Sequence, residues 1–518
     1  MKRLFVTIVA GVALLLLCLT GANKPVAADD KISVVTTFYP VYEFTKAVTG
    51  DTADVTMLVK AGTEPHDFEP STKNIATISD ADVFVYLDDN METWVDSVVS
   101  SVKAPQLTVV KATGDMLLLA GTTEEEEEGE SHEGHSHAYD PHVWLSPKRA
   151  MMLVENIRDA FIAKYPDKAE VFTNNAAAYL TELSDLDALY TDKLSQAKQK
   201  SFVTQHAAFG YLALDYGLTQ IPITGISADS EPSAKRLVNL AKYVQKYDIR
   251  YIYFEKNASS KVAETLADET GVKTAVLNPI ESLTSKEMKS GENYISEMKA
   301  NLKALELTTD VAGKTIKAEE DTGKTIENGY FKDKDITDRS LKDWSGKWQS
   351  VYPYLVNGDL DQVWEYKAQL SKGEKTAEEY KDYYTTGYQT DVDHININGR
   401  KNTITFIKGD QKYQFTYKYS GYKVLTYEKG NRGVRYLFET DDPNAGEFKY
   451  VQFSDHNISE TDSTHFHIFW GGKSQKALLK EMSHWPTYYP DDLTGKEIAQ
   501  DMVAHESQKL EVANFKLL

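Results

Sequence analysis

Cysteine is almost absent from this sequence, because Cys18 is the only one among 518 residues. Disulfide bonds within the chain are excluded, and so are metal sites built from several thiolates. Positive charge is also scarce: 57 Lys and Arg are opposed by 78 Asp and Glu, for a formal net charge of -21. Nucleic acid is not expected as a partner, since phosphate binding needs clustered basic side chains. A soft-metal site in this chain would have to use histidine.

Long hydrophobic runs are missing too, except within residues 1–28. There, Lys2 and Arg3 precede an apolar run that ends near Cys18, which is the layout of an export signal. Two alternatives stay open: lipidation of Cys18, as in bacterial lipoproteins, although Leu17 stands where a small residue is usual, or cleavage after Ala28. The first predicts a lipid anchor on the extracellular face of the bacterial cell membrane, and the second predicts secretion. No other stretch approaches the roughly 20 apolar residues of a membrane-spanning helix.

Residues 30–308 alternate short β-rich runs with helical ones, which predicts an α/β domain. Between Pro166 and Phe202 there is neither glycine nor proline, and apolar residues recur at three- and four-residue steps. This spacing predicts a long helix near the middle of the domain. We expect the helix to join an N-terminal α/β lobe to a C-terminal one.

The pattern changes after this domain. Residues 309–329 lose the apolar periodicity and become charged and rich in glycine and threonine, which predicts a linker. Within residues 330–518 apolar and polar residues alternate, as at Tyr413, Phe415, Tyr417 and Tyr419, and turn signals follow at short intervals. Short strands at such spacing predict an all-β-rich barrel or sandwich.

Three histidines of the first domain stand at strand ends or helix starts. His66 follows the strand-like DVTMLV, His142 opens a helical stretch in DPHVW, and His206 ends the strand-like SFVTQH. Glu281 has an equivalent place after TAVL. Ligands bind at strand ends in open α/β sheets, and three imidazoles with one carboxylate suit tetrahedral zinc. The alternative is that each histidine only caps a helix or satisfies a buried polar group.

Several stretches of this domain resemble the zinc-specific, ZnuA-like solute-binding proteins of bacterial ABC importers. The resemblance spans about residues 30–308 and is carried by TTFYPVYEFTKAV, AGTEPHDFEPS, DPHVWLSP, FVTQHAAFGYLALDYGL, EPSAKRL and YIYFEKNAS. It implies two lobes joined by a rigid helix, with zinc held between them. The implied ligands are His66, His142, His206 and Glu281. Manganese relatives carry a carboxylate in place of the third histidine, so His206 favours zinc.

An acidic, histidine-rich loop at residues 121–139 precedes the ligand-bearing DPHVW. It contains His132, His135 and His137 after the run EEEEE. Such a loop is a recurring feature of these zinc importers, which implies weak capture of zinc and transfer to the cleft. The alternative interpretation is a disordered segment that only improves solubility.

The second domain has its own histidine group. His465 and His467 are two residues apart in HFHIFWGG, so they share one face of a strand, and His456 lies shortly before them. Residues 328–507 resemble the ZinT family of periplasmic zinc-binding proteins, through LKDWSGKWQSVYPYL, YKDYYTTGYQTD, YVQFSDHNI, HFHIFWGG and HWPTYYP. This resemblance implies a lipocalin-like barrel whose zinc ligands are His456, His465 and His467. For His484, the spacing does not decide between a zinc ligand, a residue that hydrogen-bonds to a ligand, and a residue that packs beside Trp485.

Together these features predict an extracellular zinc receptor of an ABC importer, which delivers Zn²⁺ to a membrane permease, with an auxiliary C-terminal zinc-recruiting domain. We expect a monomer without catalytic activity. Two alternatives stay open. Three histidines also describe a catalytic zinc, so a zinc-dependent hydrolase or hydratase is possible in principle, although no H-E-x-x-H is present. The histidine-rich loop would also suit a surface adhesin.

Overall fold

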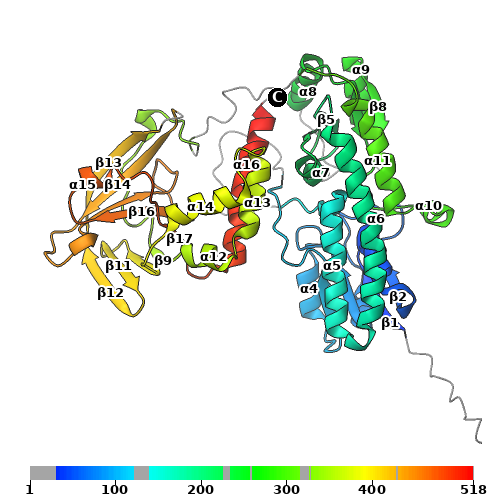
Figure 1. Ribbon diagram of the computed structural model, residues 1–518, viewed down its shortest axis with the longest axis horizontal. Helices are drawn as coiled ribbons and strands as arrows, with labels where there is room; N and C mark the ends of the chain where they lie inside the picture. Colours follow the sequence, from blue (N-terminus) through cyan, green and yellow to red (C-terminus); the bar gives the residue numbers. More distant parts are fainter. Residues whose placement is uncertain are drawn as a thin grey trace, which may run out of the picture.

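The computed structural model describes residues 31–121, 139–225, 234–256, 260–314, 326, 328–427 and 430–516. Cys18 and the loop histidines His132, His135 and His137 lie outside the described residues. Figure 1 shows a two-lobed α/β domain and a β-rich domain, with α16 (Gly495–Lys516) between them. Among the described helices, none is both long and apolar enough to cross a membrane.

Each lobe of the first domain contains a parallel four-stranded sheet with the same strand arrangement. The first sheet has the order β2-β1-β3-β4 and the second has the order β6-β5-β7-β8. The strands are β1 Ile32–Thr36, β2 Ala53–Met57, β3 Val83–Tyr86, β4 Thr108–Lys111, β5 Ser201–Thr204, β6 Thr219–Pro222, β7 Tyr251–Phe254 and β8 Lys273–Val276. Parallel strands place their carboxyl ends at one edge of a sheet, so the loops after them can form one site. The predicted α/β architecture is confirmed.

Helices cover these sheets and connect the lobes. They are α2 Tyr39–Thr49, α3 Thr72–Ser79, α4 Val95–Ser101, α5 Pro147–Lys164, α6 Ala169–Ser195, α7 Gly210–Asp215, α8 Ala234–Lys246, α9 Lys261–Thr270, α10 Ser285–Ser290 and α11 Tyr294–Thr309. The predicted long helix is α6, whose 27 residues span about 40 Å. It packs against α2 of the first lobe and α11 of the second. The structure therefore confirms a helix that spans both lobes.

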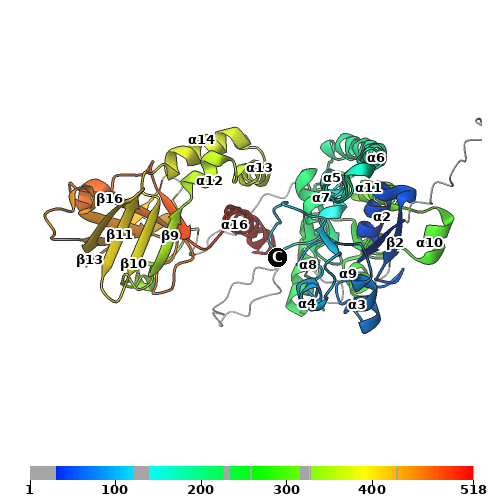
Figure 2. The same cartoon turned by 90° about the horizontal axis from the view of Figure 1, so that it is seen from below.

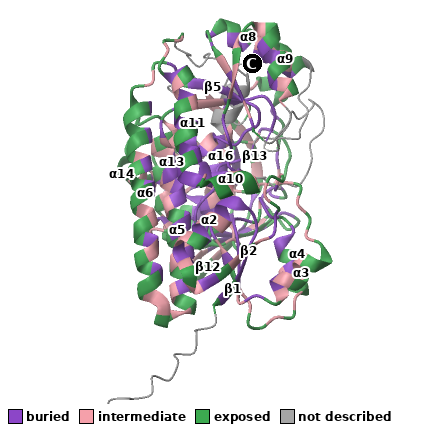
Figure 3. Ribbon diagram, turned by 90° about the vertical axis from the view of Figure 1, so that its right-hand side faces the viewer, coloured by how far each residue is buried: buried purple, intermediate pink, exposed green. Residues whose placement is uncertain are grey.

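One face of α6 is buried and the other is exposed, as Figure 3 shows. The buried residues recur at helical spacing and are Phe172, Ala176, Leu183, Leu186, Tyr190 and Leu194. Val171, which continues the apolar pattern in the sequence, is 41% exposed because it lies on the solvent side. Such an amphipathic helix is stabilised by packing along its whole length, which makes it a stiff connection between the lobes.

The second domain is a nine-stranded antiparallel sheet with the order β12-β11-β10-β9-β17-β16-β15-β14-β13. Its strands are β9 Gly346–Ser350, β10 His394–Asn398, β11 Thr403–Lys408, β12 Gln411–Thr416, β13 Lys418–Thr426, β14 Arg432–Glu439, β15 Tyr450–Ser454, β16 Phe466–Gly471 and β17 Thr487–Pro490. Only Tyr417 separates β12 from β13, although these strands form the two ends of the sheet. The sheet therefore curls back on itself into a half-barrel around an aromatic core that includes Trp344, Tyr436 and Phe453.

Helices of the second domain were not predicted from the sequence. They are α12 Tyr352–Asn357, α13 Asp361–Leu370, α14 Ala377–Tyr388, α15 Gln475–Leu478 and α16. Thr376 and Glu379 form a capping box at the start of α14, so a start signal is present in the sequence. The helix was missed because the many tyrosines and threonines that follow this start signal are residues that favour strands. The linker at residues 309–329 stays a prediction, and α11 ends at Thr309, inside it.

Residues 115–120 of the first domain bind the second domain directly. The backbone N–H of Leu118 donates to Oε1 of Gln500 at 2.8 Å, and Nε2 of Gln500 donates back to the Leu118 carbonyl at 2.7 Å. The N–H of Ala120 donates to Oγ of Ser507 at 2.9 Å. Gln500 and Ser507 are seven residues apart, so they lie on one face of α16. Figure 2 shows α16 between the domains in a second view.

An arginine also contributes to this interface. Arg149 on α5 pairs with Asp215 through Nε and Nη2, each at 2.9 Å, and its Nη1 donates to the hydroxyl of Tyr366 on α13. That hydroxyl donates to the carbonyl of Leu117. Arg149, Tyr366 and Leu117 are buried, and the side chain of Asp215 is only 3% exposed. Buried charged and polar groups need such partners, so the contact fixes how the domains meet.

Candidate metal centres

The four predicted ligand residues of the first domain meet between the lobes. One ligand atom each of His66, His142, His206 and Glu281 lies within 4.8 Å of all the others. His66 comes from the loop after β2, and His206 lies two residues beyond β5. Glu281 comes from the loop after β8, and His142 precedes the turn Val143–Leu145 that leads into α5. The structure thus brings together side chains that are more than 200 residues apart in the sequence.

The distances within this cluster match a tetrahedral metal site. Nε2 of His142 lies 3.1 Å from Nε2 of His66 and 3.3 Å from Nε2 of His206. Oε1 of Glu281 lies 3.4 to 3.5 Å from all three nitrogens. Zn–N bonds of about 2.0–2.1 Å in a tetrahedron place neighbouring ligand atoms about 3.3 Å apart. Five of the six separations among the four atoms therefore match the spacing that one zinc ion requires, and the sixth is within 4.8 Å.

Two carboxylates fix the orientation of the imidazoles. Nδ1 of His142 lies 2.8 Å from Oδ1 of Asp140, and Nδ1 of His206 contacts Oε1 of Glu255. Since a carboxylate accepts hydrogen bonds, each Nδ1 carries the proton and each Nε2 points into the cluster. The residues Asp140 and Glu255 were not predicted, because acidic residues near strand ends are too common to single out in a sequence.

Electrostatics in the cluster favour a bound cation. Burial works to lower the pKa of His206, but the charges and hydrogen bonds of Glu255 and Glu281 together outweigh it and hold that pKa well above its usual range. His142 also has a raised pKa, because its hydrogen bonds to Asp140 and Glu281, together with the charge of Asp140, outweigh burial. Burial dominates at His66 and lowers its pKa. Burial alone would raise the pKa of Glu281, but the three imidazoles hold it well below its usual range.

Glu281 itself is held by an unusual backbone. Ile280, the residue before it, has a φ of 56°, which is rare for a β-branched side chain. The N–H of Ile280 donates to Oδ1 of Asn278 at 2.9 Å, and Nδ2 of Asn278 donates to Glu297 at 2.7 Å. Oε1 of Glu281 is buried and has no hydrogen bond of good geometry among the described residues. Strain and an unsatisfied oxygen at one position are typical of a ligand-binding site.

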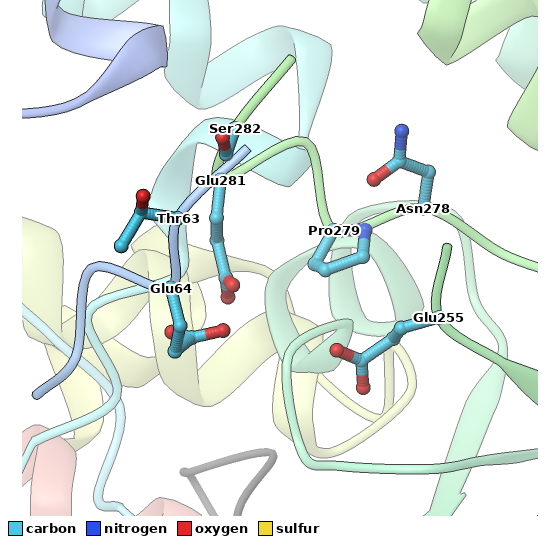
Figure 4. Close-up of a pocket in the computed structure, with 7 residues that line it drawn as sticks. All are labelled: Thr63, Glu64, Glu255, Asn278, Pro279, Glu281 and Ser282. Atoms are coloured by element: carbon cyan, nitrogen blue, oxygen red, sulfur yellow. The ribbon is translucent and has the colours of Figure 1, made fainter. Parts of the chain in front are cut away.

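A second acid, Glu64, lies beside the cluster. Figure 4 shows its carboxylate next to that of Glu281, in a cavity that Glu255 reaches from the other side. Burial, and then the charge of Glu281, raise the pKa of Glu64 to about 9. The cavity measures only about 10 Å³, close to the space for one water. The space beside the first centre therefore holds no more than about one water, and of the four ligand side chains that of His66 is the most exposed, at 10%.

The predicted histidines of the second domain also meet. His456, His465 and His467 each offer a ligand atom within 4.8 Å of the others. Nε2 of His467 lies 3.3 Å from Nε2 of His456, and its Nδ1 lies 2.7 Å from Oγ1 of Thr487. Phe466 on β16 is fully buried on the opposite face, as the predicted alternation requires. His456 has a φ of 64°, so this centre also contains a backbone outlier.

The second centre is more open than the first. Its cavity measures about 210 Å³, and the imidazole of His456 is exposed. His505 on α16 lines the same cavity. Burial, and then the neighbouring His456 and His465, hold the pKa of His467 well below its usual range. His484 does not join the cluster, since its Nε2 donates to the carbonyl of Gln389.

Two family models match the chain. The model for the zinc-uptake complex component A (ZnuA), described as periplasmic, matches residues 34–307. The model for ZinT (YodA), described as periplasmic and lipocalin-like with a role in zinc recruitment, matches residues 322–505.

Similar proteins and structures extend over both matched regions. "Zinc-binding protein AdcA" of Streptococcus pyogenes is 62% identical over 492 residues, which cover 93% of this chain and 96% of that protein. "Zinc-binding lipoprotein AdcA" of Streptococcus pneumoniae is 58% identical over 508 residues, covering 98% of this chain and 100% of that protein. The crystal structure of Zn(II)-bound AdcA from Streptococcus pneumoniae matches with a TM-score of 0.81 at 59% identity, covering 92% of this chain and 100% of that one.

Proposed function

Since the chain belongs to the zinc-uptake complex component A family and also contains a ZinT domain, we propose that it captures Zn²⁺ outside the cell for import. Delivery goes to the membrane permease of an ABC importer, the class of partner that a solute-binding protein serves. The ion is cargo, so tight binding must be followed by release. The chain acts as a monomer in this proposal.

The first centre holds the cargo through His66, His142, His206 and Glu281. The observation that carries this assignment is the spacing of three Nε2 atoms and one carboxylate oxygen: five of their six separations are 3.1 to 3.5 Å, and all are within 4.8 Å. Imidazole nitrogens suit zinc better than the harder Mn²⁺, which favours oxygen ligands. Burial of His142, His206 and Glu281 limits the access of water and of competing chelators to the bound ion.

The second centre recruits zinc through His456, His465 and His467. Its open cavity allows the ion to enter and leave without a large movement of the domain. This supports an auxiliary role, in which the ZinT domain gathers zinc when the ion is scarce and the first domain delivers it. The histidine-rich loop adds His132, His135 and His137 as weak capture sites. Its two ends are joined by the bridge between Ala120 and Tyr139, just before His142 of the first centre in the sequence.

The protein is anchored to the extracellular face of the cell membrane through a lipid on Cys18. The relative from Streptococcus pneumoniae is named a zinc-binding lipoprotein, which supports this placement. An anchored receptor stays close to its permease, so captured zinc is not lost by diffusion.

Zinc in the first centre is transported and does not catalyse a reaction. A catalytic zinc keeps one coordination position for water or substrate. Here four protein atoms fill the tetrahedron, and the adjoining cavity has room for about one water. Zinc-loaded protein should therefore show no saturable hydration of CO₂ and no ester hydrolysis, and saturable turnover would contradict the proposal.

Growth under zinc limitation tests the transport function. In a strain that lacks its own zinc receptor, the intact chain should restore growth in chelator-treated medium, whereas His206→Ala should not. The matched control is His394→Ala, because His394 is exposed on β10 and lies outside both centres. Restored growth with His206→Ala would contradict the assignment of the first centre.

A further inference from the structure

Helix α16 places a fourth imidazole at the second centre. The ring centre of His505 lies 6.1 Å from that of His465 and 6.3 Å from that of His456. The ring centres of the proposed ligands are separated by 5.4 to 6.1 Å. His505 therefore stands at nearly the same spacing from the ligands as they have among themselves.

Coordination chemistry gives this imidazole a place to bind. Zinc in protein sites is almost always four-coordinate, and three histidines leave one position open. Glu506 lines the same cavity, but its carboxylate lies 2.8 Å from Nζ of Lys367. His505 is not among the atoms that already meet within 4.8 Å, so its ring must move inward when the ion binds. A movement of this kind would be transmitted to α16.

The same helix is attached to both domains. Oη of Tyr489 on β17 donates to Oδ2 of Asp501 at 2.9 Å, and the ring of His465 stacks on Tyr489 at 5.1 Å. Asp501 and His505 are four residues apart, so both face the sheet. Gln500 and Ser507 lie on the adjacent face and bind residues 118 and 120 of the first domain. The cavity and the domain interface thus share one rigid element.

We infer that His505 is the fourth ligand of the second zinc centre, so that zinc bound there fixes α16 and strengthens its contact with residues 118–120. This inference rests on the proposed function, because it assumes that His456, His465 and His467 bind zinc. In this inference α16 has two roles: it supplies a ligand to the second centre, and it holds the two domains together. It also makes the interface between the domains sensitive to zinc.

X-ray absorption at the zinc edge counts the imidazoles. The full chain with His206→Ala leaves the second centre as the zinc site, and its spectrum should fit four imidazoles. Adding His505→Gln, which preserves the side-chain length and keeps the helix folded, should leave three imidazoles and one light-atom ligand. The affinity for zinc should fall at least about tenfold, the lower limit for loss even of an outer-sphere partner. Adding His394→Ala instead should change neither result.

Hydrogen exchange gives a second measurement that a purely structural role of His505 would not affect. Zinc should slow exchange at the amides of Leu118 and Ala120 in the His206→Ala chain, and should not do so once His505→Gln is added. The inference would be overturned if the His206→Ala chain showed three imidazoles and the same zinc affinity with and without His505→Gln. That result would leave the second centre intact. Zinc bound equally well by a chain with His206→Ala and His465→Ala would instead refute the second centre itself.

Discussion

Nδ1 of His142 and Oδ1 of Asp140 lie 2.8 Å apart, and both residues are buried. The hydroxyl of Tyr211 donates to the Asp140 carbonyl at 2.7 Å and accepts from the N–H of Leu119 at 2.9 Å. Leu119 belongs to the segment that binds the second domain. The orientation of a proposed zinc ligand is thus built into the same network of hydrogen bonds as the interface between the domains.

Replacing Asp140 by Asn should weaken zinc binding at the first centre without changing the number of ions bound. The amide still accepts a hydrogen bond, but it loses the charge that stabilises the imidazole of His142 as a ligand. Outer-sphere partners of this kind contribute about 10- to 100-fold in affinity. Calorimetric titration would measure the change. Asp192→Asn, on the exposed face of α6, is the matched control, and equal affinities in the two variants would contradict this role.

Acidification should weaken the first centre more steeply than the second. The pKa values of His142 and His206 are raised in the metal-free protein, so zinc must displace protons there. Its affinity therefore falls as the pH drops below those raised values, by about tenfold per pH unit for each proton displaced. The pKa of His467 is lowered, so this ligand stays neutral to a lower pH.

Competition titrations from about pH 8 to about pH 5.5 would check this difference, since unperturbed histidine titrates within that range. His465→Ala would isolate the first centre, and His206→Ala would isolate the second. If affinity changed equally with pH in the two variants, or did not change with pH, zinc would not displace more protons at the first centre than at the second, and the prediction would be wrong.

Tyr366→Phe should loosen the domain interface without affecting either metal centre. The variant leaves Nη1 of Arg149 and the carbonyl of Leu117 without their shared partner, and a buried unsatisfied group costs about 1–3 kcal/mol. Amides of residues 117–120 should exchange faster with solvent, while zinc stoichiometry stays constant. Tyr383→Phe is a suitable control because Tyr383 is 51% exposed. Unchanged exchange would mean that this hydroxyl does not stabilise the interface.

Much of the first centre could be predicted from the sequence, since parallel strands bring their carboxyl ends together. His66, His206 and Glu281 each follow a strand, so their meeting follows from the α/β pattern once two lobes are assumed. The supporting residues could not be predicted in this way. Glu64 has a raised pKa only because the fold buries it against Glu281, and no local pattern reports that burial.

The interface between the domains could not be predicted from the sequence either, because burial between two domains leaves no local sequence pattern. Residues 116–119, MLLL, are apolar and would fit the inside of a lobe, yet the second domain also covers them. Helix α16 carries His505, and its apolar pattern is too weak to predict either its length or its two faces. His465 and His467 were easier, because their two-residue spacing at the start of β16 fixes their common face.

Zinc stoichiometry tests the central claim most directly. Elemental analysis and calorimetry on the mature full-length chain should find one strong site in each domain. His206→Ala should remove only the first, His465→Ala should remove only the second, and His394→Ala should remove neither. A chain that binds a single zinc ion, with an affinity that neither His206→Ala nor His465→Ala alters, would contradict the two-centre account.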